Sequence, residues 1–227
     1  GEGQSSDAGE VRGNDNSEST EESGEIRQEL NEELEDIRSQ QATLDSLVTN
    51  GEFSEAKEML ADIEHRLDSL NRRGSRQGLD EFESEIKRLQ RRYSNYLSKS
   101  RVISLLREMD YYEFEQLVAK IWSARGWKTK VTRGSADRGV DVIATKQDAF
   151  ERRRHLIQAK CHGENSKVGS EDIQRYAGLY ARDEDVDAVF VVTTNGFTSE
   201  AKKVAGNRDV TLVNADELYE MLRETSP

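Results

Sequence analysis

The sequence predicts an α/β domain with a mixed sheet between helices, preceded by a helical bundle or coiled coil. Two observations predict this fold class. Residues 26–98 repeat apolar side chains at steps of three and four, which is typical of packed helices. Residues 101–227 alternate short β-branched or apolar runs with helical patterns, which indicates a sheet covered by helices. Residues 1–25 contain almost nothing apolar, and we expect them to form a disordered acidic tail.

The region 26–100 is expected to contain three helices. The first stripe consists of Ile26, Leu30, Leu34, Ile37, Leu44 and Val48, and Gln41 interrupts it. Asn50 and Gly51 predict the end of this helix, and further stripes run from residue 53 to 70 and from 79 to 96. Either the three helices fold back into a bundle, or they pair with a second copy. We expect a spacer and dimerisation element; a target-recognition module is the alternative.

The region 101–227 reads as one domain. A helix is predicted at about 102–124, with a break near Asp110. Strands are predicted at 127–132, 139–145, 155–160, 187–194 and 210–213, and further helices at 170–182, 199–205 and 215–223. The run at 187–194 is apolar almost throughout, which indicates a strand covered on both faces. This order of elements predicts a mixed sheet sandwiched between helices.

The charge of the chain is distributed unevenly. It holds 33 basic and 45 acidic residues, for a net charge of −12, but residues 101–227 are almost neutral. Local basic groups in that domain can therefore still form a positive face. The single cysteine, Cys161, excludes an intramolecular disulfide and fits a reducing compartment. No apolar run approaches the roughly 20 residues of a membrane helix, so we expect a soluble, cytoplasmic protein without membrane contact.

The candidate site lies on two neighbouring strands. Asp141 interrupts an apolar run, and a buried carboxylate is costly unless something pairs with it. On the next strand, the two-residue period places Gln158 and Lys160 on one face and Ala159 on the other. A carboxylate, a second oxygen ligand and a lysine at the ends of paired strands suit magnesium-dependent hydrolysis of a phosphodiester.

Each of these residues has an expected role. Asp141 is the metal carboxylate, Gln158 offers a neutral amide oxygen, and Ala159 offers a backbone carbonyl. Lys160 polarises the attacking water or stabilises the negative charge that develops. The expected cation is Mg²⁺, with Mn²⁺ as a substitute. A structural salt bridge between Asp141 and Lys160 is the alternative interpretation.

Residues from about 109 to 222 resemble the catalytic domain of Mrr-type restriction endonucleases, a branch of the PD-(D/E)xK nucleases. The matching residues are Tyr112-Glu113-Phe114-Glu115, Gly139 to Ala144, Gln158-Ala159-Lys160, and Thr193 to Thr198 with Ala201. The resemblance implies a restriction-endonuclease-like α/β/α sandwich, in which Asp141 and Gln158 bind magnesium and Lys160 is catalytic. It also implies that Glu115 assists from the first helix. The Mrr protein itself has a DNA-reading winged-helix domain where this sequence has helical stripes, so a preference for methylated DNA is not carried over.

Two basic groups are candidates for contacting DNA phosphates. Arg152, Arg153 and Arg154 stand in the expected turn between the two site strands. Lys128, Lys130 and Arg133 alternate along the preceding strand and extend the same positive face. A solvated charged turn is the alternative for the arginines. Asp137, in a glycine-rich loop, is a candidate for a second metal or for substrate orientation, or simply shapes the turn.

The sequence therefore predicts a metal-dependent endonuclease that acts on double-stranded DNA. A role in prokaryotic, antiviral defence follows from the resemblance alone. Cutting both strands needs two active sites, so we expect a homodimer or larger assembly organised through residues 26–98. The alternatives are a structure-selective repair or junction nuclease of the same fold, and a non-catalytic DNA-binding regulatory module.

Overall fold

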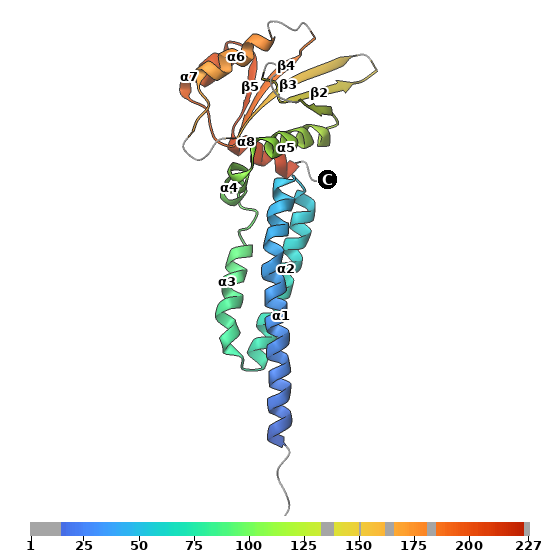
Figure 1. The fold of residues 1–227 in the computed structure, drawn as a ribbon, viewed down its shortest axis with the longest axis vertical. Coiled ribbons are helices and arrows are strands. Elements are labelled where there is room, and N and C mark those ends of the chain that lie inside the picture. The colour runs from blue at the N-terminus through green and yellow to red at the C-terminus, as the bar shows by residue number, and fades with distance from the viewer. Residues whose placement is uncertain (1–14, 133–138, 150, 162–165, 181–184, 225–227) are drawn as a thin grey trace, which may run out of the picture.

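The chain forms a long helical rod that carries a β-sheet with helices on both faces (Figure 1). The computed structural model describes residues 15–132, 139–149, 151–161, 166–180 and 185–224. Among the helices in these ranges, none is both long enough and apolar enough to cross a membrane.

The rod consists of three long helices and one short one. They are α1 (Asp15–Thr49), α2 (Phe53–Arg76), the 3-10 helix η1 (Asp80–Phe82) and α3 (Glu83–Tyr93). Helix α1 begins at Asp15, inside the range expected to be a tail. A helix closes its own backbone hydrogen bonds, so its polar first turns need no apolar partner. Residues 1–14 lie outside the described residues.

The apolar stripes of the rod pack against one another within a single chain. Leu30, Ile37, Leu44, Val48, Ile63, Leu67 and Leu70 are fully buried, and Ile86 and Leu89 nearly so. The backbone carbonyl of Gln41, the residue that interrupts the first stripe, accepts a hydrogen bond from the Tyr96 hydroxyl at 3.2 Å. The Tyr93 hydroxyl donates to the carbonyl of Ile37 at 3.0 Å. The three helices therefore fold back into a bundle, and their stripes do not need a second copy for burial.

The turn between α1 and α2 docks the rod against the nuclease-like domain. Gly51 ends α1 with φ 75°, and the amides of Gly51 and Glu52 bond to carbonyls of the last helical turn. Lys120 of α5 (Tyr111–Ala124) donates to the carbonyl of Asn50 at 3.2 Å. A single apolar core continues from the rod through α5 to one face of the sheet. The rod is thus packed onto the domain.

The sheet has five strands in the order β1-β2-β3-β4-β5. They are β1 (Lys128–Val131), β2 (Val142–Gln147), β3 (Arg152–Lys160), β4 (Ala188–Thr193) and β5 (Val210–Val213). The first three strands pair antiparallel, and β3, β4 and β5 pair parallel, so the sheet is mixed as predicted.

Helices cover both faces of this sheet (Figure 1). One face packs against α5 and α8 (Ala215–Glu224), and α4 (Lys99–Glu108) joins them to the rod. The other face packs against α6 (Ser170–Tyr180) and α7 (Ser199–Gly206), which bury a second apolar cluster. The predicted fold class, an α/β/α sandwich behind a helical region, is confirmed.

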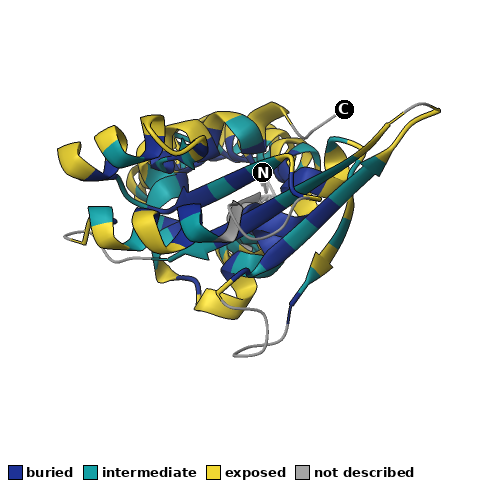
Figure 2. Ribbon diagram, turned by 90° about the horizontal axis from the view of Figure 1, so that it is seen from above, coloured by how far each residue is buried: buried dark blue, intermediate teal, exposed yellow. Residues whose placement is uncertain are grey.

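One predicted strand boundary needs correction. Strand β3 begins at Arg152 rather than at His155, so Arg152, Arg153 and Arg154 belong to the strand and not to a turn. Antiparallel pairing with β2 continues as far as the pair Gln147 and Arg152. Figure 2 shows this β2–β3 hairpin extending beyond the buried part of the sheet, where its end is exposed. Arg152 is exposed there, whereas Arg153 and Arg154 are half-buried, and the guanidinium of Arg153 lies 6.0 Å from the Trp127 ring.

Replacement of Gly51 by alanine tests the docking of the rod. The left-handed backbone at Gly51 costs an alanine about 1–2 kcal/mol, and its Cβ would lie 3.0 Å from the Cδ1 atom of Leu117. We expect Gly51→Ala to lower the free energy of unfolding, measured in urea, by more than Gly78→Ala does. Gly78 is the matched control because it has φ 66° and no atom within 4 Å of the added Cβ. Equal losses would show that Leu117 does not constrain the turn.

Candidate functional site

Asp141 is fixed where β2 meets β3. Its amide donates to the carbonyl of Ile157 at 3.1 Å, so the pairing of the two strands extends one residue beyond the start of β2. Its Oδ2 atom accepts a hydrogen bond from the amide of Ala159 at 2.8 Å and another from the side-chain amide of Gln158. The carboxylate is therefore oriented by the opposite strand.

Gln158 presents a buried oxygen without a protein partner. Its side-chain NH₂ group donates to Asp141, which leaves Oε1 pointing elsewhere. The residue is 8% exposed, and within the described part of the chain its Oε1 atom accepts no hydrogen bond. A Cβ atom on Gly139, where φ is 88°, would lie 3.5 Å from this oxygen. Such unsatisfied acceptors are rare, and a cation bound there would supply the missing partner.

Lys160 lies on the same face of β3 as Gln158. Its ammonium nitrogen lies 5.7 Å from the ring centroid of Tyr176, a buried residue of α6. Lys160 and Asp141 form no salt bridge, although both are among the described residues, but the charge of Lys160 stabilises the ionised form of Asp141. The ammonium group thus lies near Asp141 and forms no ion pair with the carboxylates that the structure describes.

Glu115 brings a second carboxylate from α5. Burial and then repulsion from Asp141 and Asp110 raise its pKa from 4.5 to about 7. Burial likewise raises the pKa of Asp141, against the lowering effects of the Ala159 amide, Lys160 and Gln158. The position of α5 is set at its first residues by a capping box between Asp110 and Glu113.

These groups fit a hard divalent cation. Carboxylate and amide oxygens are the ligands that Mg²⁺ prefers, and Asp141, Glu115 and Gln158 offer such oxygens. Within the described ranges, His, Cys, Asp and Glu nowhere gather in groups of three or more that suit a metal ion. The oxygens that these residues offer a cation are two carboxylates and a neutral amide, and their role as ligands stays a prediction. The Ala159 side chain packs against the core on the opposite face, and its carbonyl as a ligand remains a prediction.

Two of the predicted DNA-contacting lysines lie on the same face of the sheet as Asp141. Lys130 is opposite Ile143 and Lys128 is opposite Thr145, two and four residues beyond Asp141. Directly opposed residues of an antiparallel pair share a face, and this face repeats every two residues. Both lysines are exposed. Arg133 and Asp137 lie outside the described residues.

The three arginines do not lie beside the site. Arg152 is six residues from Gln158 along β3, which corresponds to about 20 Å at about 3.3 Å per residue. Arg153 turns to the other face, where its guanidinium lies 6.0 Å from the Trp127 ring. The expectation that the arginines contact DNA phosphates stays a prediction for Arg152 and Arg154, which share the face of Gln158, and it fits Arg153 less well because of its place near Trp127.

Tyr176 was not identified as a site residue from the sequence. It is 2% exposed, and its ring lies between Lys160 and Gly139. The apolar positions Ile173, Tyr176 and Ala177 indicate only an inward face of α6. No local pattern tells which inward residue meets the site, because that depends on how α6 crosses the sheet.

The raised pKa of Glu115 predicts a pH-dependent stability in the absence of metal. The folded state holds this proton up to about pH 7, whereas the unfolded chain releases it near 4.5. The stabilisation by protonated Glu115 is therefore lost as the pH rises from about 4.5 to 7. With chelator present, Glu115→Gln should raise the melting temperature at pH 8, by roughly 2–4 °C per kcal/mol, but not at pH 4.5.

Glu58→Gln is the control for this prediction, since Glu58 is exposed on α2. If Glu115→Gln and Glu58→Gln gave the same melting curves at pH 8, burial of Glu115 beside Asp141 would be contradicted.

Comparison with known proteins places residues 106–222 in the restriction endonuclease family described by the Mrr catalytic domain. An uncharacterized protein of Sinorhizobium fredii, y4cE, is 27% identical in an alignment of 168 residues that covers 68% of this chain and 42% of that protein. The chain thus spans less than half the length of the curated relative it matches.

Several solved structures have similar folds. MspJI, a restriction endonuclease solved with a 27-mer oligonucleotide, is 22% identical with a TM-score of 0.43, over 58% of this chain and 31% of MspJI. AspBHI, a DNA modification-dependent restriction endonuclease, is 20% identical with a TM-score of 0.47, over 57% of this chain and 36% of AspBHI. Because the family model covers more than half of the chain, the chain belongs to the Mrr-type restriction endonuclease family and carries a nuclease domain of that type.

Proposed function

We propose that the chain is a Mg²⁺-dependent endonuclease that hydrolyses phosphodiester bonds of double-stranded DNA. The observation that carries the proposal is the placement of Asp141, Gln158 and Lys160 on one face, with the buried Oε1 of Gln158 unpartnered. A non-catalytic DNA-binding module explains this less well. Such a module gives no task to the buried Oε1 atom of Gln158, which is costly to leave without a partner, or to the half-buried ammonium group of Lys160, which pairs with no described carboxylate.

The chain's residues divide the work of hydrolysis. When bound, a divalent cation lowers the pKa of coordinated water and offsets charge on the scissile phosphate. The Ala159 amide and Gln158 hold the Asp141 carboxylate in one orientation for that cation. Lys160 donates hydrogen bonds to the attacking water or to the phosphate oxygens. Without a cation, burial and the nearby Asp141 raise the pKa of Glu115 to about 7, so a cation that binds there would displace its proton.

The biological setting is proposed from the family. We propose cytoplasmic defence against foreign DNA, in which two copies of the chain cut the two strands. The apolar stripes of α1, α2 and α3 are buried within the chain, so contacts between copies must use polar surfaces of the rod or another face.

Mn²⁺ is the expected substitute cation. A structure-selective repair or junction nuclease is the second candidate, and exposed aromatic residues beside Glu115 favour it.

Replacement of Lys160 by alanine tests the proposed activity. Its ammonium group stabilises charge that develops only in the transition state, so plasmid cleavage in Mg²⁺ should fall by about 10²–10³-fold. DNA binding should be largely unchanged. Asp141→Asn should abolish cleavage and weaken Mg²⁺ binding, and chelator should stop the wild-type reaction.

Lys203→Ala is the matched control, because Lys203 is an exposed lysine paired with Glu200 on α7. Cleavage by Lys160→Ala at the rate of Lys203→Ala would remove the proposed site.

Lys128 and Lys130 are expected to contact phosphates. Replacing either by alanine should weaken binding of all DNA sequences alike and reduce the slope of log K against log salt by about 1. Arg153→Ala should leave this slope unchanged, because Arg153 lies on the opposite face against Trp127. The slope is measured by fluorescence anisotropy at several salt concentrations, and unchanged slopes for both lysine variants would place the DNA elsewhere.

A further inference from the structure

Two exposed aromatic rings stand at the start of the helix that carries Glu115. Tyr111 and Tyr112 are 75% and 57% exposed, and they are the large apolar residues of the described chain that solvent reaches most. They precede Glu115 by four and three residues, so all three share one side of the first turns of α5. One helical turn rises about 5.4 Å, so both rings lie about one turn from Glu115 and therefore close to the proposed site.

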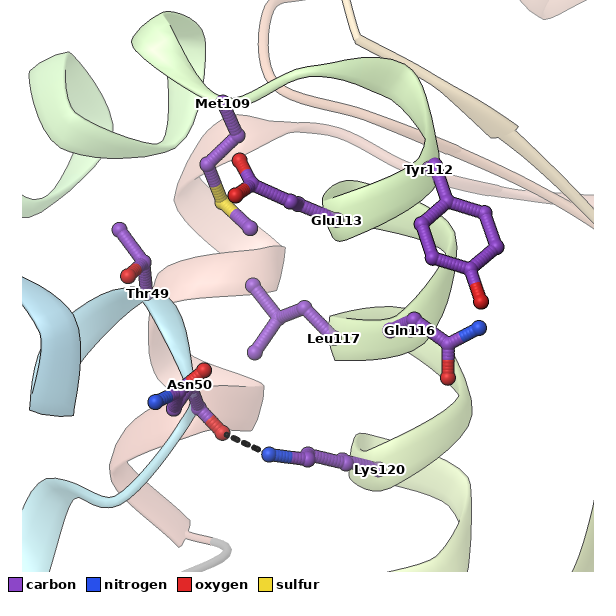
Figure 3. Close-up of a pocket in the computed structure, with 8 residues that line it drawn as sticks. All are labelled: Thr49, Asn50, Met109, Tyr112, Glu113, Gln116, Leu117 and Lys120. Carbon is purple, nitrogen blue, oxygen red and sulfur yellow. Dashed lines mark hydrogen bonds between the residues drawn. The ribbon is translucent and has the colours of Figure 1, made fainter.

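A cavity opens beside Tyr112, between α5 and the turn that joins α1 to α2 (Figure 3). Its volume is about 290 Å³, and it is lined by Thr49, Asn50, Met109, Tyr112, Glu113, Gln116, Leu117 and Lys120. Figure 3 shows the hydroxyl end of the Tyr112 ring near the side-chain amide of Gln116. The cavity thus combines an aromatic edge, apolar walls and amide groups.

Two side-chain amides of this cavity are available to a ligand. Those of Asn50 and Gln116 form no hydrogen bond with other described residues, whereas the backbone of Asn50 donates to Ser46 and accepts from Lys120. Amides of this kind pair with the edges of nucleobases, which present donors and acceptors together. The pattern of stacking surface and amides matches how enzymes hold a base outside the helix.

The charge around the rings argues against a phosphate as the bound group. Glu108, Asp110 and Glu113 are exposed beside Tyr111 and Tyr112, and the carboxylates of Asp110 and Glu113 are engaged in the capping box. Carboxylates repel phosphate oxygens, whereas a base is uncharged and stacks on aromatic rings. In an intact duplex the faces of the bases are hidden, so only an unpaired nucleotide can use this surface.

We propose that Tyr111, Tyr112 and the cavity that Tyr112 lines bind an unpaired nucleobase next to the cleaved phosphodiester. This assignment rests on the proposed nuclease function and narrows its substrate to DNA that is bulged, frayed or distorted at the cut. Tyr111 and Tyr112 supply the stacking surface, and Gln116 and Asn50 contact the edge of the base. Glu115 lies on the same turns of α5 as the two rings, so the bound base lies next to the proposed active site.

The test measures binding separately from cleavage. Two labelled duplexes are compared that differ by one unpaired 2-aminopurine nucleotide, with the full chain carrying Lys160→Ala and chelator present. We expect tighter binding of the bulged DNA by about 10-fold, the scale of one base–aromatic stack, with quenching of the 2-aminopurine fluorescence. Tyr112→Ala and Gln116→Ala should each reduce this preference and leave affinity for the intact duplex unchanged.

Tyr112→Phe is the matched control, because it keeps the stacking ring and removes the hydroxyl. It should keep the preference and the quenching. Equal affinity for the two DNAs, or an unchanged preference in Tyr112→Ala, would overturn the inference. Loss of the preference in Tyr112→Phe would also overturn it, since the hydroxyl and not the ring would then make the contact.

The outcome also separates the two proposals. If the wild-type chain cuts plasmid DNA with magnesium while bulged and intact duplexes bind equally, the nuclease function stands and the base site fails. If the chain binds and quenches the bulged DNA but cuts nothing, the base site stands and the nuclease function fails.

Discussion

The antiparallel register between β2 and β3 is the constraint on which the site depends. It places Asp141 opposite Gln158, so the carboxylate accepts hydrogen bonds from the side chain of Gln158 and the amide of Ala159. A slip of one residue would turn Gln158 and Lys160 toward the apolar face that packs on α5. Both strands bury apolar side chains on that face, including Val142 and Ile157, so the burial that stabilises the sheet also fixes the register.

Helix α5 connects the site to the rest of the molecule. It packs on three strands with one side, presents Glu115 toward Asp141, and contacts the turn of the rod through Leu117 and Lys120. Its first residues are held by the Asp110–Glu113 capping box, which limits fraying at the end nearest the site. The rod therefore influences where Glu115 lies, because it is bound to the same helix rather than to a separate loop.

Much of the fold could be predicted from sequence because the deciding signals are local. The stripes of the rod, the break at Asp110 and the apolar run before Thr194 each predict one element, and the structure has them. Asp141, Gln158 and Lys160 could be identified because each interrupts an apolar strand. Local signals do not show which helix, or which chain, an apolar stripe packs against. The stripe from Ile26 to Val48 fits a second copy of the chain as well as it fits α2 and α3.

The errors have the same origin in three-dimensional context. Arg152 to Arg154 carry no apolar alternation, so the start of β3 could not be located and the arginines were expected in a turn. Tyr176 was missed because its role depends on the angle at which α6 crosses the sheet. The cavity beside Tyr112 depends on contact between residues about sixty positions apart, Asn50 and α5.

The site is arranged at the expense of stability. Burial raises the pKa of both Asp141 and Glu115, which means that their charged forms are unfavourable where they lie, and the Oε1 atom of Gln158 adds an unsatisfied acceptor. A structural role alone would favour apolar residues of similar size at these positions. The continuous core of rod and sheet compensates for this cost by burying the stripes of α1 and α2 together with Val142 and Ile157. Any ligand that neutralises the two carboxylates and bonds to Gln158 must bind the folded state preferentially and stabilise it, so binding at this site and folding of the chain are coupled.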